Sequence, residues 1–390
     1  MKVAHISDTH LGYVQYKTAE RKLDFILAFE KAINACIEEG VDLILHTGDL
    51  FETYHPDMVT LSRCIRALQK VKAHGIEFVA ITGNHDRALR RGVIPPHRIL
   101  EDLGILKLLN YKPDSPVEDF SFLRDGVLIA GFQYFPRRML NVLKEELFDK
   151  LSELAAKASV SILMFHQGVG QYLPYEDSFE LELLELPDGF DYYAGGHVHV
   201  FAKEKLKKGI LSFAGATEFR TVKEAERGKR GFNIFDTEEK SLKRVELEGL
   251  RPFKVARLSE ETAEKSLEEI AEFVSSASQP PVVIINYEYK SLEIETFSKI
   301  LEEIERNSLL LRITKRRVTL ETGEISLPGK TFSEFLEEFL REQNHGDKVV
   351  NLAKEVLSAN PEHIQEILKE FVKRELKENA EEIEKFLREI

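Results

Sequence analysis

Polar side chains that can bind metal ions follow several short apolar runs of this sequence. Gly83-Asn84-His85-Asp86 follows the apolar residues 78–81, and such a run stopping at Gly-Asn predicts a buried strand that ends in a loop. Other runs end in the same way with a carboxylate or an imidazole, so we expect their ends to meet at one edge of a sheet. The side chains at these ends are Asp8, His10, Asp49, Asn84, His85, His166, His197 and His199.

This set offers imidazole, carboxylate and amide donors and no thiolate. Such donors suit a borderline divalent ion, such as manganese, iron or zinc, better than magnesium or calcium. The donors are too many for one ion, which favours two ions that share one carboxylate. Asp49 is the natural bridge, since it has two oxygens and lies between the ligand sets in sequence order. Ions roughly 3.5–4 Å apart can activate a water and hold phosphoryl oxygens during an in-line displacement.

Predicted strands and helices alternate along the first part of the chain. Strands at 3–6, 43–46 and 78–81 are separated by amphipathic helices, which predicts a layered α/β fold. If the first strand continues through Asp8 and His10, these two side chains point to the same side. Residues 211–215 and 232–235 are expected to be antiparallel strands that close this domain.

Breaks in the pattern divide the chain into four parts. We expect a metal-binding domain at 1–250, ended by Arg251-Pro252, and a small domain of alternating strands and helices at 251–320. A linker and helix at 321–346 and helices at 347–390 would follow. The apolar stripes of these last short helices favour a surface that binds another chain, although they could also cover this protein's own core.

Composition places the chain among globular proteins. It has 390 residues, of which 43% are hydrophobic and 31% are charged, and its formal net charge is -13. This charge argues against a protein that coats nucleic acid, but not against a local basic site. No run has the length of a signal peptide or a membrane span, so a cytoplasmic protein without membrane contact is expected. Cys36 and Cys64 are expected to be buried apolar residues without a disulfide.

The ordered polar blocks also resemble a known family. Asp8-Thr9-His10, Gly48-Asp49-Leu50, Gly83-Asn84-His85-Asp86, His166-Gln167-Gly168 and Gly196-His197-Val198-His199 look like the five motifs of the calcineurin-like metallophosphoesterases. Residues 11–13, 50–51 and 192–197 more closely resemble archaeal members of the Mre-eleven/SbcD family of DNA break-repair nucleases. The resemblance implies a layered β-sandwich flanked by helices, with a small α+β capping domain and C-terminal helices.

The resemblance also implies roles for single residues. One Mn²⁺ would be held by Asp8, His10, Asp49 and His199, and a second by Asp49, Asn84, His166 and His197, with Mg²⁺ or another ion as the weaker alternative. His85 would protonate the leaving 3′ oxygen or stabilise the transition state, and Asp86 could orient it. Several family members carry a histidine where this chain has Glu52, which leaves a second catalytic histidine in doubt. His55 is a possible substitute.

The function implied by the resemblance is a manganese-dependent nuclease that processes DNA ends as a 3′-5′ exonuclease and an endonuclease. It would work as a homodimer, built from the stretches near Leu61 and Leu100, with a Rad-fifty/SbcC-type ATPase bound to the C-terminal helices. The small domain would hold the duplex. Basic residues that could contact phosphates are Arg87, Arg90, Arg91, Arg137, Arg138, Lys315, Arg316 and Arg317, and ordinary solvated charge explains each of them equally well.

Two other functions stay open. The same scaffold could hydrolyse small phosphate esters or phosphoproteins, although this use needs neither the small domain nor the terminal helices. Alternatively, the protein could tether DNA ends with structural metals.

Histidines that lie within a helix or strand, or that have no partner motif, are expected to be structural. They are His5, His46, His74, His97, His345 and His363.

Overall fold

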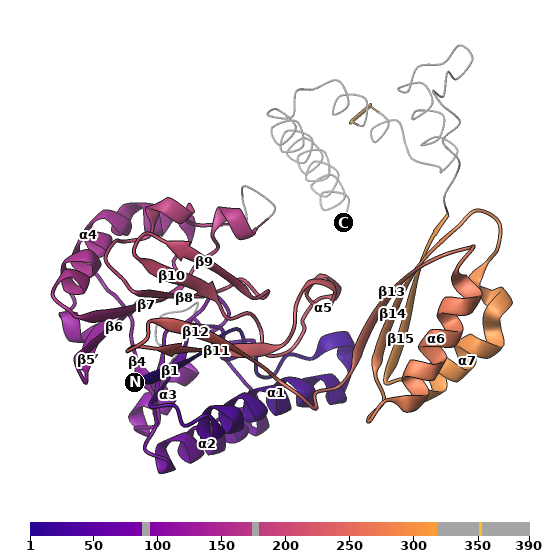
Figure 1. The fold of residues 1–390 in the computed structure, drawn as a ribbon, viewed down its shortest axis with the longest axis horizontal. Helices are drawn as coiled ribbons and strands as arrows, with labels where there is room; N and C mark the ends of the chain where they lie inside the picture. Colours follow the sequence, from indigo (N-terminus) through magenta and orange to yellow (C-terminus); the bar gives the residue numbers. More distant parts are fainter. Residues whose placement is uncertain (88–93, 174–178, 318–350, 353–390) are drawn as a thin grey trace, which may run out of the picture. The chain divides into compact units, whose positions relative to one another are not determined.

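The computed structural model describes residues 1–87, 94–173, 179–317 and 351–352 (Figure 1). Arg90, Arg91 and the predicted helices after residue 320 therefore lie outside the described residues, apart from residues 351–352, and so do His345 and His363. Within the described part, no helix is both long enough and apolar enough to cross a membrane.

The first sheet has the strand order β12-β11-β1-β2-β3-β4. β1 to β4 are mutually parallel, while β11 runs antiparallel to β1 and β12. The strands are β1 (Lys2–Ile6), β2 (Leu43–His46), β3 (Glu77–Ala80), β4 (Lys107–Leu108), β11 (Gly231–Asp236) and β12 (Ser241–Glu246).

Three helices connect the parallel strands of this sheet: α1 (Ala19–Glu38), α2 (Met58–Ala73) and α3 (Pro96–Asp102). α1 begins after Thr18, whose hydroxyl accepts a hydrogen bond from the Arg21 N–H, and α2 begins after the capping carboxylate of Asp57. Their apolar faces bury Phe29, Cys64 and neighbouring side chains against the sheet. Cys36 and Cys64 are buried free thiols, as the sequence predicted.

The second sheet has the order β5-β6-β7-β8-β10-β9 and is covered by helix α4 (Arg137–Ala156). Its strands are β5 (Ser121–Arg124), β6 (Val127–Phe132), β7 (Val160–His166), β8 (Tyr192–Gly196), β9 (Ala202–Leu206) and β10 (Gly209–Phe213). β10 is antiparallel to β9, as predicted for 211–215, but it is parallel to β8, so the prediction is wrong for that second pairing. The prediction for 232–235 is confirmed by β11.

The two sheets pack face to face around a shared apolar layer. Leu45 and Val79 from the first sheet lie in one buried cluster with Ile129, Ile162 and Met164 from the second. β2 is buried at every position, which explains its continuous apolar run, since a strand covered on both faces shows no alternation. Helices outside and sheets inside form the layered α/β sandwich that the sequence predicted.

A third sheet, which we call the small sheet, follows in the chain. It consists of β13 (Phe253–Ser259), β14 (Val282–Tyr289) and β15 (Leu310–Arg317), all parallel and packed against α6 (Ala263–Ser276) and α7 (Ser298–Asn307). The parallel strands make this unit α/β, so its description as α+β is wrong. Short elements elsewhere are α5 (Val222–Arg227) and 3-10 turns at Gln15–Lys17, Val117–Asp119, Gly170–Tyr172, Leu183–Glu185 and Ile294–Phe297.

Candidate metal centre

The polar strand ends come from both sheets of the sandwich. β1, β2 and β3 are parallel in the first sheet, and β7 and β8 are parallel in the second. Their carboxyl ends therefore deliver loops to the same side of each sheet. Hydrogen bonds join the two sets, because His166 Nδ1 lies 2.7 Å from the Thr47 carbonyl oxygen and the His197 N–H donates to the Asp8 carboxylate at 3.2 Å. The polar strand ends therefore meet between two sheets, whereas the sequence predicted that they meet at one edge of a single sheet.

The loop after β1 differs from the predicted strand. β1 ends at Ile6, and Asp8 and His10 adopt the left-handed region with φ of 51° and 44°. Such a φ is costly for residues other than glycine and is found where the surrounding structure enforces it. Here the Asp8 N–H donates to the Gly48 carbonyl at 3.2 Å, and the His10 N–H donates to the Asp49 carbonyl at 3.0 Å. The loop after β2 thus enforces this conformation.

One group of donors gathers around Asp8. His10 Nε2 lies 3.3 Å from His199 Nε2, and His199 Nε2 lies 3.7 Å from Asp8 Oδ1. The donor atoms of these three residues lie within 4.8 Å of one another. Two imidazole nitrogens that face each other beside a carboxylate are stabilised by a cation between them. The donor set therefore fits a divalent metal ion.

A second group of donors gathers around Asn84. Asn84 Oδ1 lies 3.1 Å from His166 Nε2 and 3.0 Å from His197 Nδ1. Asp49 lies between the two groups, with its Oδ2 3.4 Å from His166 Nε2 and 3.8 Å from His10 Nε2. A carboxylate in this position can serve two ions at once.

Most of the imidazoles turn Nδ1 away from the cluster. His166 Nδ1 faces the Thr47 carbonyl, and His199 Nδ1 lies 3.0 Å from Glu224 Oε1. His10 Nδ1 lies 3.0 Å from Glu52 Oε2, although the ring N–H does not point along that line. An acceptor at Nδ1 keeps the proton there and leaves the Nε2 lone pair free to bind a metal.

Burial and charge act against each other at these groups. Burial alone disfavours the imidazolium of His166, but the charge of Asp49 and their hydrogen bond raise its pKa to about 9. At Asp49, burial is likewise outweighed by His166, so the Asp49 pKa lies well below its usual value. Burial raises the pKa of Asp8 and lowers the pKa of His10. Without a cation, the charge of Asp49 is therefore compensated by a proton on His166.

Two glycines allow the loops to approach this closely. Gly48 has φ of +96°, and a Cβ there would lie 2.3 Å from His166 Nδ1. A Cβ on Gly83 would lie 2.1 Å from Asp49 Oδ1. Any larger residue at either position would displace a donor of the cluster.

His85 borders the cluster, and Glu52 holds it there. The rings of His85 and His10 meet edge to face with centroids 5.0 Å apart. His85 Nδ1 lies 3.0 Å from the Glu52 carbonyl oxygen and 3.7 Å from Glu52 Oε1. Glu52 Oε1 also accepts a hydrogen bond from Arg220 at 3.0 Å. The position that departs from the family pattern is thus part of the site.

Asp86 does not contact His85, so its predicted orienting role is not supported by the geometry. Its carboxylate accepts hydrogen bonds from the N–H groups of Leu50, Phe51 and Gly83 instead. His55 is exposed, and its ring packs against Tyr54 at 4.2 Å. The described contacts of His55 do not bring it to the cluster.

The sequence reasoning missed two neighbours of the cluster. Glu224 on α5 contacts His199, as described above, and the ring of Tyr134 stacks on His197 with centroids 6.0 Å apart. The order Thr221-x-x-Glu224 is a capping-box pattern that predicts the start of a helix, and Thr221 does cap α5. No pattern in the sequence indicates that the Glu224 side chain turns toward a histidine.

The basic residues differ in their surroundings. The Arg87 guanidinium lies 5.4 Å from the centre of the Tyr134 ring, which places it beside the cluster. Lys315 and Arg316 pair with acidic residues of the small sheet and its neighbouring turn, and Arg317 donates to a backbone carbonyl. Arg137 and Arg138 begin α4 and are exposed.

Four histidines that were expected to be structural lie within the fold. His5 contacts Tyr192 and Thr47, His46 contacts Thr9, and His74 Nδ1 faces a carbonyl of its own helix α2. His97 is buried, and its Nε2 lies 3.7 Å from Asp86 Oδ2.

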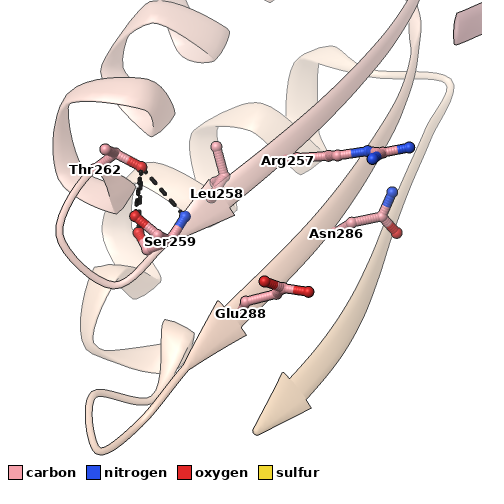
Figure 2. A pocket seen from close by; sticks show the side chains of 6 residues that line it. All are labelled: Arg257, Leu258, Ser259, Thr262, Asn286 and Glu288. Carbon is pink, nitrogen blue, oxygen red and sulfur yellow. Dashed lines mark hydrogen bonds between the residues drawn. The ribbon is translucent and has the colours of Figure 1, made fainter. Parts of the chain in front are cut away.

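A polar groove of about 540 Å³ lies away from the cluster, on the small sheet (Figure 2). It is lined by Arg257, Leu258, Ser259, Thr262, Asn286 and Glu288.

Comparison with known proteins agrees with this geometry. Residues 1–201 match the family of calcineurin-like phosphoesterases. The DNA double-strand break repair protein Mre11 of Saccharolobus solfataricus is 32% identical over 95% of this chain and 98% of its own length. The Mre11 proteins of Sulfolobus acidocaldarius (36% identical over 60% of each chain) and Methanocaldococcus jannaschii (29% over 95% of this chain and 98% of its own) are also similar.

The fold and the matched residues define a metal-dependent phosphoesterase of the calcineurin-like class. Within that class, the similarity over nearly the whole chain is more specific. The chain belongs to the Mre11 family.

Proposed function

We propose that this protein is a manganese-dependent nuclease that cuts DNA ends, as a 3′-5′ exonuclease and as an endonuclease, during double-strand break repair. The observation that carries the proposal is the placement of Asp49 between two groups of nitrogen and oxygen donors. Relatives named as DNA double-strand break repair proteins support the choice of DNA as substrate.

The family resemblance implies two ligand sets, and the two donor groups support them. We assign Asp8, His10, Asp49 and His199 to one ion, and Asp49, Asn84, His166 and His197 to the other. Mixed nitrogen and oxygen donors without thiolate favour Mn²⁺ over Mg²⁺. When bound, two such ions supply an activated water and compensate the charge of the phosphoryl oxygens. The protein's part is to hold these donors rigidly through the contacts between the loops.

His85 would assist departure of the 3′ oxygen. Its Nδ1 is occupied by the Glu52 carbonyl, so Nε2 is the nitrogen free to donate a proton. The side chain is 28% exposed, which leaves room for a substrate beside it. Imidazole suits such a role near neutral pH, and positioned proton donors typically contribute about 10²–10⁴-fold to rate.

Arg87 is the strongest candidate for a contact to the DNA backbone. Its Nε is buried without a hydrogen-bond partner, and the guanidinium lies over Tyr134, whose ring stacks on His197. A cation in this place can hold a phosphate next to the scissile bond. Lys315, Arg316 and Arg317 would be weaker contacts because each already has a partner in its own unit.

We further propose a homodimer and an ATPase partner. Large apolar side chains are exposed on or beside α2 and α3, including Met58 (76% exposed), Val59 (65%) and Leu103 (51%), and a second copy could cover them. Leu61 is only partly buried against the core and Leu100 is fully buried, so the neighbours rather than these two residues would form the contact. The apolar stripes of 347–390 support a surface that binds another chain, and the family resemblance suggests a Rad-fifty/SbcC-type ATPase as that chain.

The test measures Mn²⁺-dependent release of nucleotides from a 3′-labelled linear duplex by the wild type and by His85→Ala. Nitrophenyl phosphates serve as a parallel substrate. We expect release by the wild type and loss of about 100-fold or more in His85→Ala, with Mn²⁺ still bound. An intact duplex together with hydrolysed nitrophenyl esters would reject the nuclease and leave a phosphatase.

A further inference from the structure

Glu224 is a buried carboxylate with both oxygens engaged. Its side chain is 9% exposed. Oε1 lies 3.0 Å from His199 Nδ1, and Oε2 accepts a hydrogen bond from the Arg220 N–H at 2.7 Å. The Glu224 N–H in turn donates to the Thr221 hydroxyl at 3.2 Å. These contacts fix the carboxylate next to His199 Nδ1, on the side of the imidazole that faces away from the cluster.

The two donor groups have different charges behind their imidazoles. In the group around Asp8, Glu224 stands behind His199, and Glu52, which also pairs with Arg220 at 3.0 Å, stands behind His10. In the group around Asn84, the atom behind His166 is the neutral carbonyl oxygen of Thr47. Within the described residues, no carboxylate is recorded in contact with the outward side of His166.

A carboxylate behind a metal-bound imidazole has two effects. It fixes the ring and the tautomer, and it makes the nitrogen that faces the metal more basic. A neutral carbonyl fixes the ring as well but adds less negative charge. The difference between Glu224 and Thr47 therefore favours a cation on the Asp8 side.

We propose that Glu224 is a positioning residue for His199 and that, together with Glu52, it makes the ion held by Asp8, His10 and His199 the more tightly bound of the two. The inference rests on the ligand assignment of the proposed function. It adds an order of filling: the Asp8 side binds Mn²⁺ first, and the Asn84 side fills at higher concentration.

The same helix supplies a matched control. Glu226 lies two residues after Glu224 on α5, and its Oε1 accepts from Arg257 Nη2 at 2.9 Å. Arg257 belongs to the small sheet (Figure 2), and Glu226 has no described contact with the cluster. Glu226→Gln removes one charge from α5 without touching His199.

The experiment titrates Mn²⁺ into the full-length, metal-free protein and follows free Mn²⁺ by electron paramagnetic resonance. Wild type, Glu224→Gln, Glu224→Ala and Glu226→Gln are compared. For the wild type we expect two separable affinities. Loss of the carboxylate should weaken the tighter site by about 10–100-fold and change the weaker one little, while Glu226→Gln behaves as the wild type.

Two further variants, each combined with Glu224→Gln, identify which of the two ions is affected. His197→Ala removes a ligand of the Asn84 side, and His10→Ala removes one of the Asp8 side. Glu224→Gln should weaken Mn²⁺ binding in the His197→Ala protein and have no effect in the His10→Ala protein. An equal effect in both backgrounds, or none in either, would overturn the proposal.

Two controls separate the possible failures. Thermal unfolding of the metal-free variants shows whether α5 is intact, and Glu224→Gln is the informative variant if Glu224→Ala unfolds. Because the readout is metal binding, the order of filling can hold even if the wild type leaves DNA uncut, and in that case only the nuclease proposal fails.

Discussion

The carboxylate of Asp86 accepts a hydrogen bond from the N–H of Phe51 at 2.7 Å. The same side chain also bonds Leu50 and Gly83, so it joins the loop after β2 to the loop after β3. Asp49 lies in one of these loops and Asn84 in the other. Asp86 therefore sets the distance between two proposed metal ligands, Asp49 and Asn84, without bonding to the side chain of either.

Asp86→Ala should destabilise the protein strongly. The substitution leaves three buried N–H groups without an acceptor, and each such group typically costs about 1–3 kcal/mol. We expect a loss of about 3 kcal/mol or more in the free energy of unfolding by urea. Asp57→Ala, which removes the exposed cap of α2, should lose about 1 kcal/mol. Similar losses for both variants would contradict the bridging role.

Mn²⁺ binding should strengthen as the pH rises. The pKa of His166 is raised to about 9 in the metal-free protein, so His166 is protonated at pH 7. An imidazole must lose its proton to bind a cation, which lowers the apparent affinity below that pKa. For the ion bound by His166 we expect about a tenfold gain per pH unit from pH 7 toward 9. Calorimetry in buffers of different ionisation enthalpy should show one proton released, and a pH-independent affinity would contradict this.

Glu52→Gln should slow the reaction without abolishing it. The backbone carbonyl that holds His85 Nδ1 remains, whereas the charge near His85, His10 and Arg220 is lost. At saturating Mn²⁺ we expect a decrease in turnover of roughly tenfold, smaller than for His85→Ala. Turnover equal to that of the wild type would show that the charge of Glu52 does not affect the rate of DNA cleavage.

Arg21 should matter far more for stability than Arg63. Arg21 is fully buried and bonded to Asp24 and Glu218, which also pair with Arg251 and Arg230. Arg21→Ala therefore removes one of the two cations beside each carboxylate and empties a buried site, which should cost about 3 kcal/mol. Arg63 pairs with Glu30 at a partly exposed site, and Arg63→Ala should cost about 1 kcal/mol or less. Denaturant unfolding of the two variants measures both values, and equal losses would refute the distinction.

Arg87→Ala should weaken binding to DNA by a similar factor for every DNA sequence. Loss of one phosphate contact reduces the slope of log affinity against log salt by about one unit. Fluorescence anisotropy with a labelled duplex, measured over a range of salt concentrations with Mn²⁺ replaced by Ca²⁺, tests this. An unchanged slope would mean that Arg87 makes no phosphate contact.

The sequence by itself determined the strand ends and the chemical types that they carry. β2 and β3 were predicted from short apolar runs because a strand buried on both faces needs apolar side chains at consecutive positions. A charged or amide side chain is costly within the apolar layer between the sheets, so Asp49 and Asn84 could be assigned to the loops beyond the strands. These are local constraints, which a sequence states directly.

Only the tertiary structure decided which residues support the cluster. Glu224 reaches His199 because α5 packs beside the loop after β8, and Asp86 bonds the preceding loop rather than its neighbour His85. The parallel pairing of β10 with β8 was also not predicted, because β8 is distant in sequence, whereas the antiparallel pairing of β10 with β9 agrees with the prediction. The partner of a side chain is set by packing between segments distant in sequence, and the hydrophobic periodicity of one segment does not indicate that partner.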